Sequence, residues 1–215
     1  MNILVFDTST DLLSAGLRKS DGRLAALVES GFRHSETLLP AIGRCLAAAS
    51  VTLGDVGLIA CTKGPGSFTG LRIGLATAKG LSLALGIPWV GIPTLDCIAA
   101  GWEEPGLTII PVLDGRKNRI YSAIYKGGLR LGEYLDIEAA GLLAMLDGED
   151  RVSFVGPDAE IFTDWVLERP GFHVERDEPE RRLSSLCALA ERRYREKGGE
   201  SVDEGPLYLR EPEIG

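Results

Sequence analysis

The sequence predicts an α/β protein of two lobes, each with three strands followed by helix, strand and helix. Three observations carry this prediction. Short apolar runs bounded by turns alternate with longer segments of helical periodicity. The same opening order of features occurs twice, about 107 residues apart. The chain has 215 residues, of which 45% are hydrophobic and 25% charged, as in folded proteins with real cores.

The first half opens with expected strands at residues 2–6, 13–18 and 22–28. A helix is expected from Ser35, a good N-cap residue, to about Ser50. Its apolar positions fall on one broad stripe: Leu38, Leu39, Ile42, Leu46 and Ala49. There follow a strand at 56–61, a long helix at 67–85, a strand at 89–92 and a short helix near 96–100.

The second half repeats this opening with strands at residues 111–117, 120–125 and 128–134. In both halves the first strand ends in an aspartate, Asp7 or Asp114, and the second contains Ser-Ala. Further elements are expected at 137–146 (helix), 152–155 (strand), 159–167 (helix), 172–174 (strand) and 183–197 (helix). We therefore expect an N-terminal lobe at 1–104 and a smaller one at 105–215. Two lobes of βββαβα type describe the actin-like ATPase architecture.

Charge and composition exclude several classes of protein. The net charge is −8, with residues 1–110 at −1 and residues 111–215 at −7. An acidic chain without a basic stripe is a poor solitary nucleic-acid binder, because phosphate neutralisation supplies most of that affinity. No apolar stretch approaches the roughly 20 residues of a membrane span, so we expect a cytoplasmic protein. The four scattered cysteines predict buried, reduced thiols.

A glycine-rich run, Gly64–Gly74, joins the strand at 56–61 to the long helix. Such a junction can aim backbone N–H groups at an anion. However, the run lacks the lysine of a phosphate loop and the glycine spacing of the dinucleotide motif. Gly70 and Gly74 instead leave one side of the helix without bulky side chains. Thr77, Ala78 and Leu81 lie further along the same side. Close packing within the chain and docking of a partner both explain such a face.

Other polar residues have two readings each. Asp7 and Asp114 suit either a metal site or a turn cap, and the turn cap is favoured because no metal-ligand cluster accompanies them. His34 suits either a base or ligand or a solvent-facing residue before the expected N-cap, and the solvent-facing position is favoured. Arg181 and Arg182 resemble a tRNA contact, but interleaved glutamates favour a solvated helix face.

The chain resembles the bacterial TsaB (YeaZ) family, most densely over residues 1–100. The resemblance rests on residues 7–10, on 34–42 and above all on 64–81, with additional matches at 114–116 and 206–210. It implies an actin-like subunit of the machinery that makes threonylcarbamoyladenosine in tRNA. It also implies pairing with TsaD, a metal-dependent transferase once described as a glycoprotease.

The resemblance further implies contact with the ATPase TsaE, a homodimer when TsaD is absent, and tRNA binding only within the complex. The implied partner interface lies on the helices at 35–50 and 67–85 and comprises Leu38, Leu39, Ile42, Leu46, Gly70, Gly74, Thr77, Ala78 and Leu81.

The sequence predicts a non-catalytic subunit without a metal site or a firm cofactor site. TsaD carries a His-x-x-x-His pair, and Thr94 and Ile98 stand at those positions here. Asp7, Thr8 and Ser9 remain candidates for weak nucleotide contact through a phosphate. Two alternatives stay open: a stand-alone enzyme of the same fold (a small-molecule kinase or metallopeptidase), and a direct tRNA-binding module.

Overall fold

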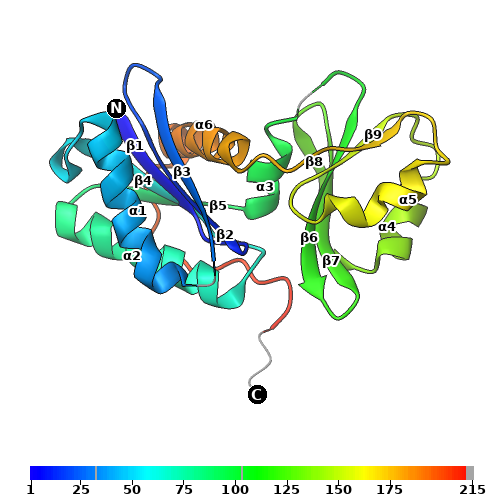
Figure 1. Ribbon diagram of the computed structural model, residues 1–215, viewed down its shortest axis with the longest axis horizontal. Helices are drawn as coiled ribbons and strands as arrows, with labels where there is room; N and C mark the ends of the chain where they lie inside the picture. Colours follow the sequence, from blue (N-terminus) through cyan, green and yellow to red (C-terminus); the bar gives the residue numbers. More distant parts are fainter. Residues whose placement is uncertain (32, 103, 212–215) are drawn as a thin grey trace. The chain divides into compact units, whose positions relative to one another are not determined.

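Two five-stranded mixed sheets organise the protein, each at the centre of its own unit (Figure 1). The computed structural model describes residues 1–31, 33–102 and 104–211. Unit 1 comprises residues 1–97 and 179–207, and unit 2 comprises residues 98–178 and the chain from 208 onward. The chain therefore passes from one unit to the other three times.

The sheet of unit 1 has the strand order β3-β2-β1-β4-β5. The first three strands form an antiparallel meander, and β4 and β5 run parallel to β1. Its strands are β1 (Asn2–Asp7), β2 (Leu12–Arg18), β3 (Leu24–Ser30), β4 (Val56–Thr62) and β5 (Trp89–Ile92). Its helices are α1 (His34–Ala49), the short 3-10 helix η1 (Leu53–Asp55), α2 (Phe68–Leu85), α3 (Thr94–Ala99) and α6 (Pro179–Lys197).

Helices cover both faces of this sheet, which explains the unbroken apolar run of β1. Successive side chains of a strand point to opposite faces. Leu4 and Phe6 pack in one cluster with residues of α1 and α2. Ile3 and Val5 pack in another with residues of α6. Unit 1 is thus a three-layer α/β structure, and strands buried on both faces read as continuous apolar sequence.

The last helix packs on the first sheet, although the expected lobe at 105–215 included it. Its apolar stripe joins the core of unit 1 through Leu183, Leu186, Cys187 and Ala190. The physical reason is that the second face of that sheet is fully apolar and must be covered. A single division after residue 104 does not describe this arrangement, because residues 179–207 return to unit 1.

The sheet of unit 2 repeats the strand order of unit 1, read as β8-β7-β6-β9-β10. Its strands are β6 (Thr108–Arg116), β7 (Arg119–Lys126), β8 (Leu129–Ile137), β9 (Val152–Val155) and β10 (Phe172–Val174). Its helices are α4 (Ala139–Met145), the 3-10 helix η2 (Ala159–Phe162) and the single turn α5 (Thr163–Val166). The duplicated topology predicted from the sequence is confirmed, while the helix expected at 159–167 is split between η2 and α5.

An aromatic cluster fills the core of unit 2. Phe154 of β9 and Phe162 of η2 stack with their ring centroids 4.2 Å apart. Trp165 meets Phe154 and Phe172 edge to face. Offset and edge-to-face aromatic pairs add stability beyond the area that they bury.

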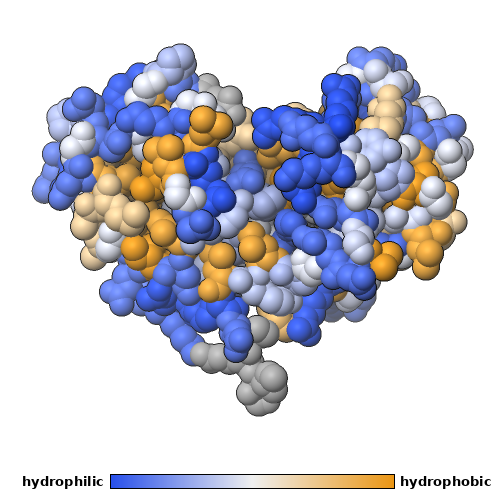
Figure 2. All heavy atoms as spheres, turned by 180° about the vertical axis from the view of Figure 1, so that it is seen from behind, coloured by the Kyte–Doolittle hydropathy of each residue, from blue (hydrophilic) through white to orange (hydrophobic). Residues whose placement is uncertain are grey.

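Among the described residues, no helix is both long and apolar enough to cross a bilayer. Seen from behind, the surface carries many hydrophilic side chains, with apolar ones in scattered groups between them (Figure 2).

Candidate functional site

The glycine-rich junction between β4 and α2 packs against the protein's own backbone. The carbonyl oxygen of Gly64 accepts a hydrogen bond from the Thr94 N–H at 2.8 Å, and the Ser67 N–H donates to the Ser9 carbonyl at 2.7 Å. A Cβ on Gly64 would lie 2.4 Å from the carbonyl oxygen of Leu207, and a Cβ on Gly66 would lie 2.3 Å from that of Ser9. These glycines are therefore required by close chain crossings and not by a bound phosphate.

Ser67 is the N-cap residue of α2, so the long helix expected at 67–85 begins within one residue of the predicted start. Its hydroxyl accepts a hydrogen bond from the Gly70 N–H at 3.3 Å. One of the N–H groups at the start of α2 that have no partner within the helix is therefore bonded to a side chain of the same protein.

Gly70 and Gly74 face the turn after β1 and not the surface. Both are buried, and a Cβ on Gly70 would lie 1.9 Å from the carbonyl oxygen of Thr8. A Cβ on Gly74 would lie 2.4 Å from the Thr8 hydroxyl, which donates a hydrogen bond to the Gly70 carbonyl at 2.8 Å. Placing these two glycines at a partner interface was therefore incorrect, because the turn at Thr8 occupies the space beside them.

The Asp7–Ser9 turn is buried and bonded within unit 1. Asp7, Thr8 and Ser9 are 1%, 0% and 2% exposed. The Oδ1 atom of Asp7 accepts hydrogen bonds from the Ser9 N–H at 2.9 Å, the Ser9 hydroxyl at 2.6 Å and the Thr62 hydroxyl at 2.7 Å. Asp7 therefore caps the turn after its strand. This geometry does not favour a nucleotide contact through these three side chains.

The second oxygen of Asp7 faces a buried arginine from the far end of the chain. Arg182 of α6 is 4% exposed, and its Nε atom lies 3.7 Å from Asp7 Oδ2. Arg182 therefore does not belong to a solvated helix face, in contrast to the sequence-based expectation. A guanidinium supplies the positive charge beside the carboxylate, the place that a cation would take in a metal site.

The residues at the histidine positions of the transferase both lie in α3, Thr94 as its first residue and Ile98 as its last but one. Thr94 and Ile98 are 0% and 1% exposed, and neither offers a nitrogen ligand. Within the described ranges, no group of three or more His, Cys, Asp and Glu side chains is arranged to hold a metal ion. Asp114, the counterpart of Asp7 in unit 2, accepts a hydrogen bond from the Arg116 N–H at 2.8 Å and so caps its own turn.

His34 is buried, although it was expected to face solvent. Helix α1 begins at His34 with Arg33 as its N-cap residue, two residues earlier than the expected cap at Ser35. The imidazole is 6% exposed, and its Nε2 atom lies 2.8 Å from the Thr10 carbonyl oxygen. Because a carbonyl only accepts, Nε2 carries the proton. The ring thus ties the start of α1 to the β1–β2 turn.

The four cysteines are free and buried, as predicted. Burial raises the pKa of Cys45 to about 11 and the pKa values of Cys61 and Cys187 to about 12. A thiolate is the reactive form of cysteine, so these thiols are poor nucleophiles at neutral pH.

The outward side of α1 and α2 carries small and apolar residues beside the exposed charged residues Glu36, Arg44 and Arg72. The two helices contact each other over the same face of the sheet (Figure 1). Leu39 is 58% exposed and Leu83 is 81% exposed. We call this surface the small-residue face and define it by Leu39, Gly43 and Ala47 of α1 and Ala76, Gly80 and Leu83 of α2, all of them exposed.

The two glycines of this face have no explanation inside the chain. A Cβ on Gly43 or Gly80 would meet nothing within 4 Å. Glycine in an exposed helix costs about 1 kcal/mol relative to alanine. A surface that keeps two such residues on neighbouring helices lets another helix approach closely, since interaxial distance depends on the side chains at the contact.

The expected interface residues fall mostly one position away from this face. Six are buried within unit 1: Leu38, Ile42, Leu46, Gly70, Gly74 and Ala78. Thr77 and Leu81 are half-buried, and Leu39 alone of the nine is exposed. Sequence reasoning missed Gly43, Ala47, Ala76, Gly80 and Leu83. The i, i+4 spacing of small residues at 43 and 47, following Leu39, and at 76 and 80 is the signal that marks them.

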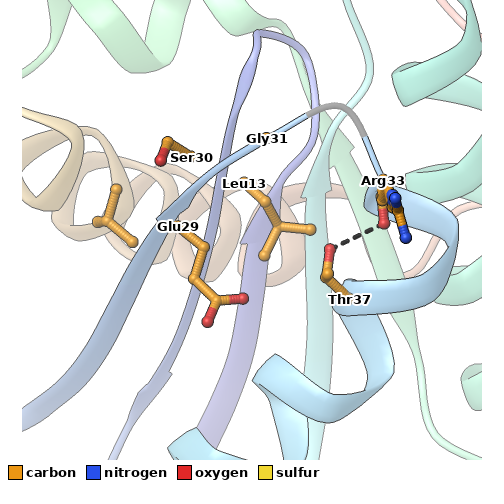
Figure 3. Close-up of a pocket in the computed structure, with 7 residues that line it drawn as sticks. Leu13, Glu29, Ser30, Gly31, Arg33 and Thr37 are labelled. Carbon is orange, nitrogen blue, oxygen red and sulfur yellow. Dashed lines mark hydrogen bonds between the residues drawn. The ribbon is translucent and has the colours of Figure 1, made fainter.

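A hollow of about 620 Å³ lies where β3 ends and α1 begins. Figure 3 shows Leu13, Glu29 and Ser30 from the strands, Arg33 just before α1 and Thr37 within α1 around it. The Thr37 hydroxyl donates to the Arg33 carbonyl at 2.9 Å, and Glu29 pairs with Arg44 at 2.6 Å. The Glu29 carboxylate is therefore already paired with a cation. The described residues that line the hollow include no cluster of catalytic groups.

Comparison with known proteins identifies the family to which the chain belongs. Residues 29–213 match the family model described as TsaD: tRNA N6-adenosine threonylcarbamoyltransferase. The chain is 32% identical over 198 residues to the tRNA threonylcarbamoyladenosine biosynthesis protein TsaB of Bacillus subtilis, covering 88% of this chain and 86% of that protein. It is 37% identical over 129 residues to TsaB of Escherichia coli, where the match spans 59% of this chain and 55% of the relative.

Solved structures show the fold. YeaZ from Pseudomonas aeruginosa superposes with a TM-score of 0.79 at 24% identity, over 97% of this chain and 99% of that one. A Bacteroides thetaiotaomicron protein described as having an actin-like ATPase fold gives a TM-score of 0.51 at 10% identity, over 86% and 95% of the two chains. The fold is therefore actin-like, and with 86% of the Bacillus protein covered, the chain belongs to the TsaB family of tRNA threonylcarbamoyladenosine biosynthesis proteins.

Proposed function

We propose that this chain is a non-catalytic subunit that pairs with a TsaD-like threonylcarbamoyltransferase and supports modification of adenosine in tRNA. Family membership supports the pathway. The observation that carries the pairing is the small-residue face, whose two open glycines have no role inside the chain. The substitution of both transferase histidines by Thr94 and Ile98 supports placing the metal chemistry in the partner.

The small-residue face fits a partner that presents helices of its own. Leu39 and Leu83 project from it as apolar anchors, while Gly43 and Gly80 lower the surface between them. A partner of the same fold carries two equivalent helices on its first sheet, so two helix pairs can pack together. In protein interfaces, a few well-packed side chains near the centre supply most of the binding energy.

Replacing Gly80 by arginine is expected to abolish pairing without damaging the fold. The new side chain points into open space, and arginine favours a helix more than glycine does. At the interface, however, its bulk and charge would be buried, so affinity for the TsaD-like partner should fall at least 100-fold. Titration calorimetry with the partner, combined with a thermal melt, measures both quantities.

Gly205→Arg is the matched control, because a Cβ on Gly205 also meets nothing within 4 Å. This variant is expected to bind the partner as the unmodified chain does. Full partner affinity in Gly80→Arg, with an unchanged melting temperature, would contradict the proposed docking surface.

We further propose that the same face joins two copies of the chain when the transferase is absent. A two-fold interface uses one patch on both copies, so Gly80→Arg should also give a monomer by mass measurement. In this proposal a TsaE-like ATPase and tRNA join only the assembled complex, and the complex works in the cytoplasm, where its tRNA substrate is found.

A further inference from the structure

The β6–β7 turn holds three consecutive residues in a backbone conformation that L side chains rarely adopt. Arg116 pairs with Arg119 across the hairpin, so Lys117 and Asn118 connect the strands. The φ angles of Arg116, Lys117 and Asn118 are 62°, 54° and 61°. Elsewhere in the described chain, Ser50 is the one non-glycine residue with positive φ.

Glycine would adopt this conformation at lower cost. A turn with positive φ at both central residues normally takes Asn-Gly or Asp-Gly. A non-glycine residue other than Asn or Asp costs about 1–2 kcal/mol there. The chain nevertheless places two long cationic side chains, Arg116 and Lys117, at such positions. We call Arg116, Lys117 and Asn118 the hairpin tip.

The side chains of the hairpin tip are exposed. The Arg116 side chain is 76% exposed, and its Nη1 atom lies 3.3 Å from Asp114 Oδ2, whose side chain is 45% exposed. Ion pairs between groups this exposed contribute little and exchange readily with other anions. The guanidinium of Arg116 can therefore turn to a different acidic group at small cost.

A second arginine pair fixes the base of the hairpin. Asp136 of β8 binds Arg119 at 2.7 Å (Nε to Oδ1) and Arg210 at 2.8 Å (Nη2 to Oδ1) and 3.0 Å (Nε to Oδ2). Arg210 also reaches the carbonyl oxygen of Gly115 at 3.4 Å. Burial alone would raise the pKa of Asp136, but hydrogen bonds from both arginines outweigh it and lower the pKa. One carboxylate thus serves two guanidinium groups.

The hairpin tip is a positive island in an acidic part of the chain. Residues 111–215 carry a net charge of −7. Around the turn, four cations (Arg116, Lys117, Arg119 and Arg210) stand against three acids (Asp114, Asp136 and Asp158, the last bonded to the Asp114 N–H at 2.8 Å). Exposed guanidinium and ammonium groups held on a rigid turn match the phosphate oxygens of a nucleic-acid backbone.

We propose that the hairpin tip contacts backbone phosphates of the tRNA held by the assembled complex. This inference rests on the proposed function, which supplies the RNA. The net charge of −8 prevents the chain from holding RNA alone, so the contact adds to binding that the partner provides. The contact is sequence-independent, because phosphates position a nucleic acid without reporting its bases.

The test compares tRNA binding by the complex of this chain with its TsaD-like partner, with and without the tip charges. In Arg116→Gln/Lys117→Gln, the dissociation constant at about 0.15 M salt should rise roughly 5- to 10-fold, and the slope of log K against log salt should shrink by about 1 to 2. The control Arg192→Gln, an exposed cation on α6, should change neither quantity. Equal affinity and salt slope in tip variant and unmodified complex would overturn the inference.

Lys117→Gly separates an RNA contact from a structural role. Glycine adopts the positive φ of this position at lower cost, and the substitution also removes one positive charge. The melting temperature should therefore rise while the affinity for tRNA falls. A rise in melting temperature with unchanged tRNA affinity would overturn the inference. So would weaker assembly with the partner at unchanged tRNA affinity, which would indicate an acidic protein surface. Failure of the unmodified chain to assemble would overturn the proposed function, and with it this inference.

Discussion

Gly70→Ala is expected to destabilise unit 1 severely, by about 3 kcal/mol or more in the free energy of unfolding. The added methyl would lie 1.9 Å from the carbonyl oxygen of Thr8, which is backbone and cannot move aside as a flexible side chain can. Either α2 shifts away from the sheet or the turn after β1 is displaced. Chemical denaturation of the purified variant measures the loss, and failure to obtain folded protein would be its extreme form.

Gly80→Ala, in the same helix, is the matched control. Its methyl would meet nothing within 4 Å, so the helix gains propensity and the free energy of unfolding should rise by about 0.5–1 kcal/mol. The same replacement of glycine by alanine is therefore expected to lower the free energy of unfolding in Gly70→Ala and to raise it in Gly80→Ala. A Gly70→Ala variant as stable as the unmodified protein would show that the turn at Thr8 is not packed as described.

Arg182→Met is expected to lower the free energy of unfolding by about 3–5 kcal/mol. Methionine keeps much of the side-chain volume but removes the charge beside Asp7, leaving a carboxylate that is 1% exposed without its cation. The ion pair joins β1 to α6, so its loss should also loosen the helix from the sheet. Urea denaturation gives the size of the effect.

The double variant Asp7→Asn/Arg182→Met tests whether the charge pair is the cause. Removing both charges should restore part of the loss, since no uncompensated charge remains, with a coupling of about 1–3 kcal/mol. Arg192→Met on the exposed side of α6 should change stability by less than about 0.5 kcal/mol. Strictly additive losses from Asp7→Asn and Arg182→Met would show that the two side chains act independently.

Local sequence patterns were sufficient to predict the helices and strands of the fold. Short apolar runs located the strands and period-3.6 patterns located the long helices, because each pattern reflects which faces the element buries. The start of α2 near Ser67 and the turn-capping role of Asp7 and Asp114 were also predictable from local sequence, since each of these side chains bonds to a backbone N–H two or three residues away. The repeated strand order followed from comparing the two halves.

The candidate site depended on contacts between distant residues, which such patterns do not report. Gly70 is small because Thr8, 62 positions earlier, lies against it. A stripe of small residues looks the same whether a turn of the same chain or a partner covers it. Helix α2 is apolar on several sides, so its burial pattern could not be read from hydrophobicity alone.

The polar errors have a related origin. Arg182 sits in a helix rich in exposed charges, and its partner Asp7 is 175 residues away. His34 was placed outside α1 because Ser35 is the better N-cap by residue type, whereas the helix is capped two residues earlier, at Arg33. In each case a side chain of a type that is usually exposed is buried, because a hydrogen-bond acceptor (for His34) or an opposite charge (for Arg182) lies beside it.

The return of α6 to the first sheet constrains the order in which the protein can fold during synthesis. The last strand of that sheet ends at Ile92, yet the helix that covers Ile3 and Val5 is complete only at Lys197. At about 5–20 residues per second, the ribosome needs roughly 5 to 20 seconds for the intervening stretch. Throughout that time an apolar sheet face remains open to water and to chaperones, while residues 98–178 emerge and can fold first. A nascent chain halted after residue 104 is thus expected to aggregate.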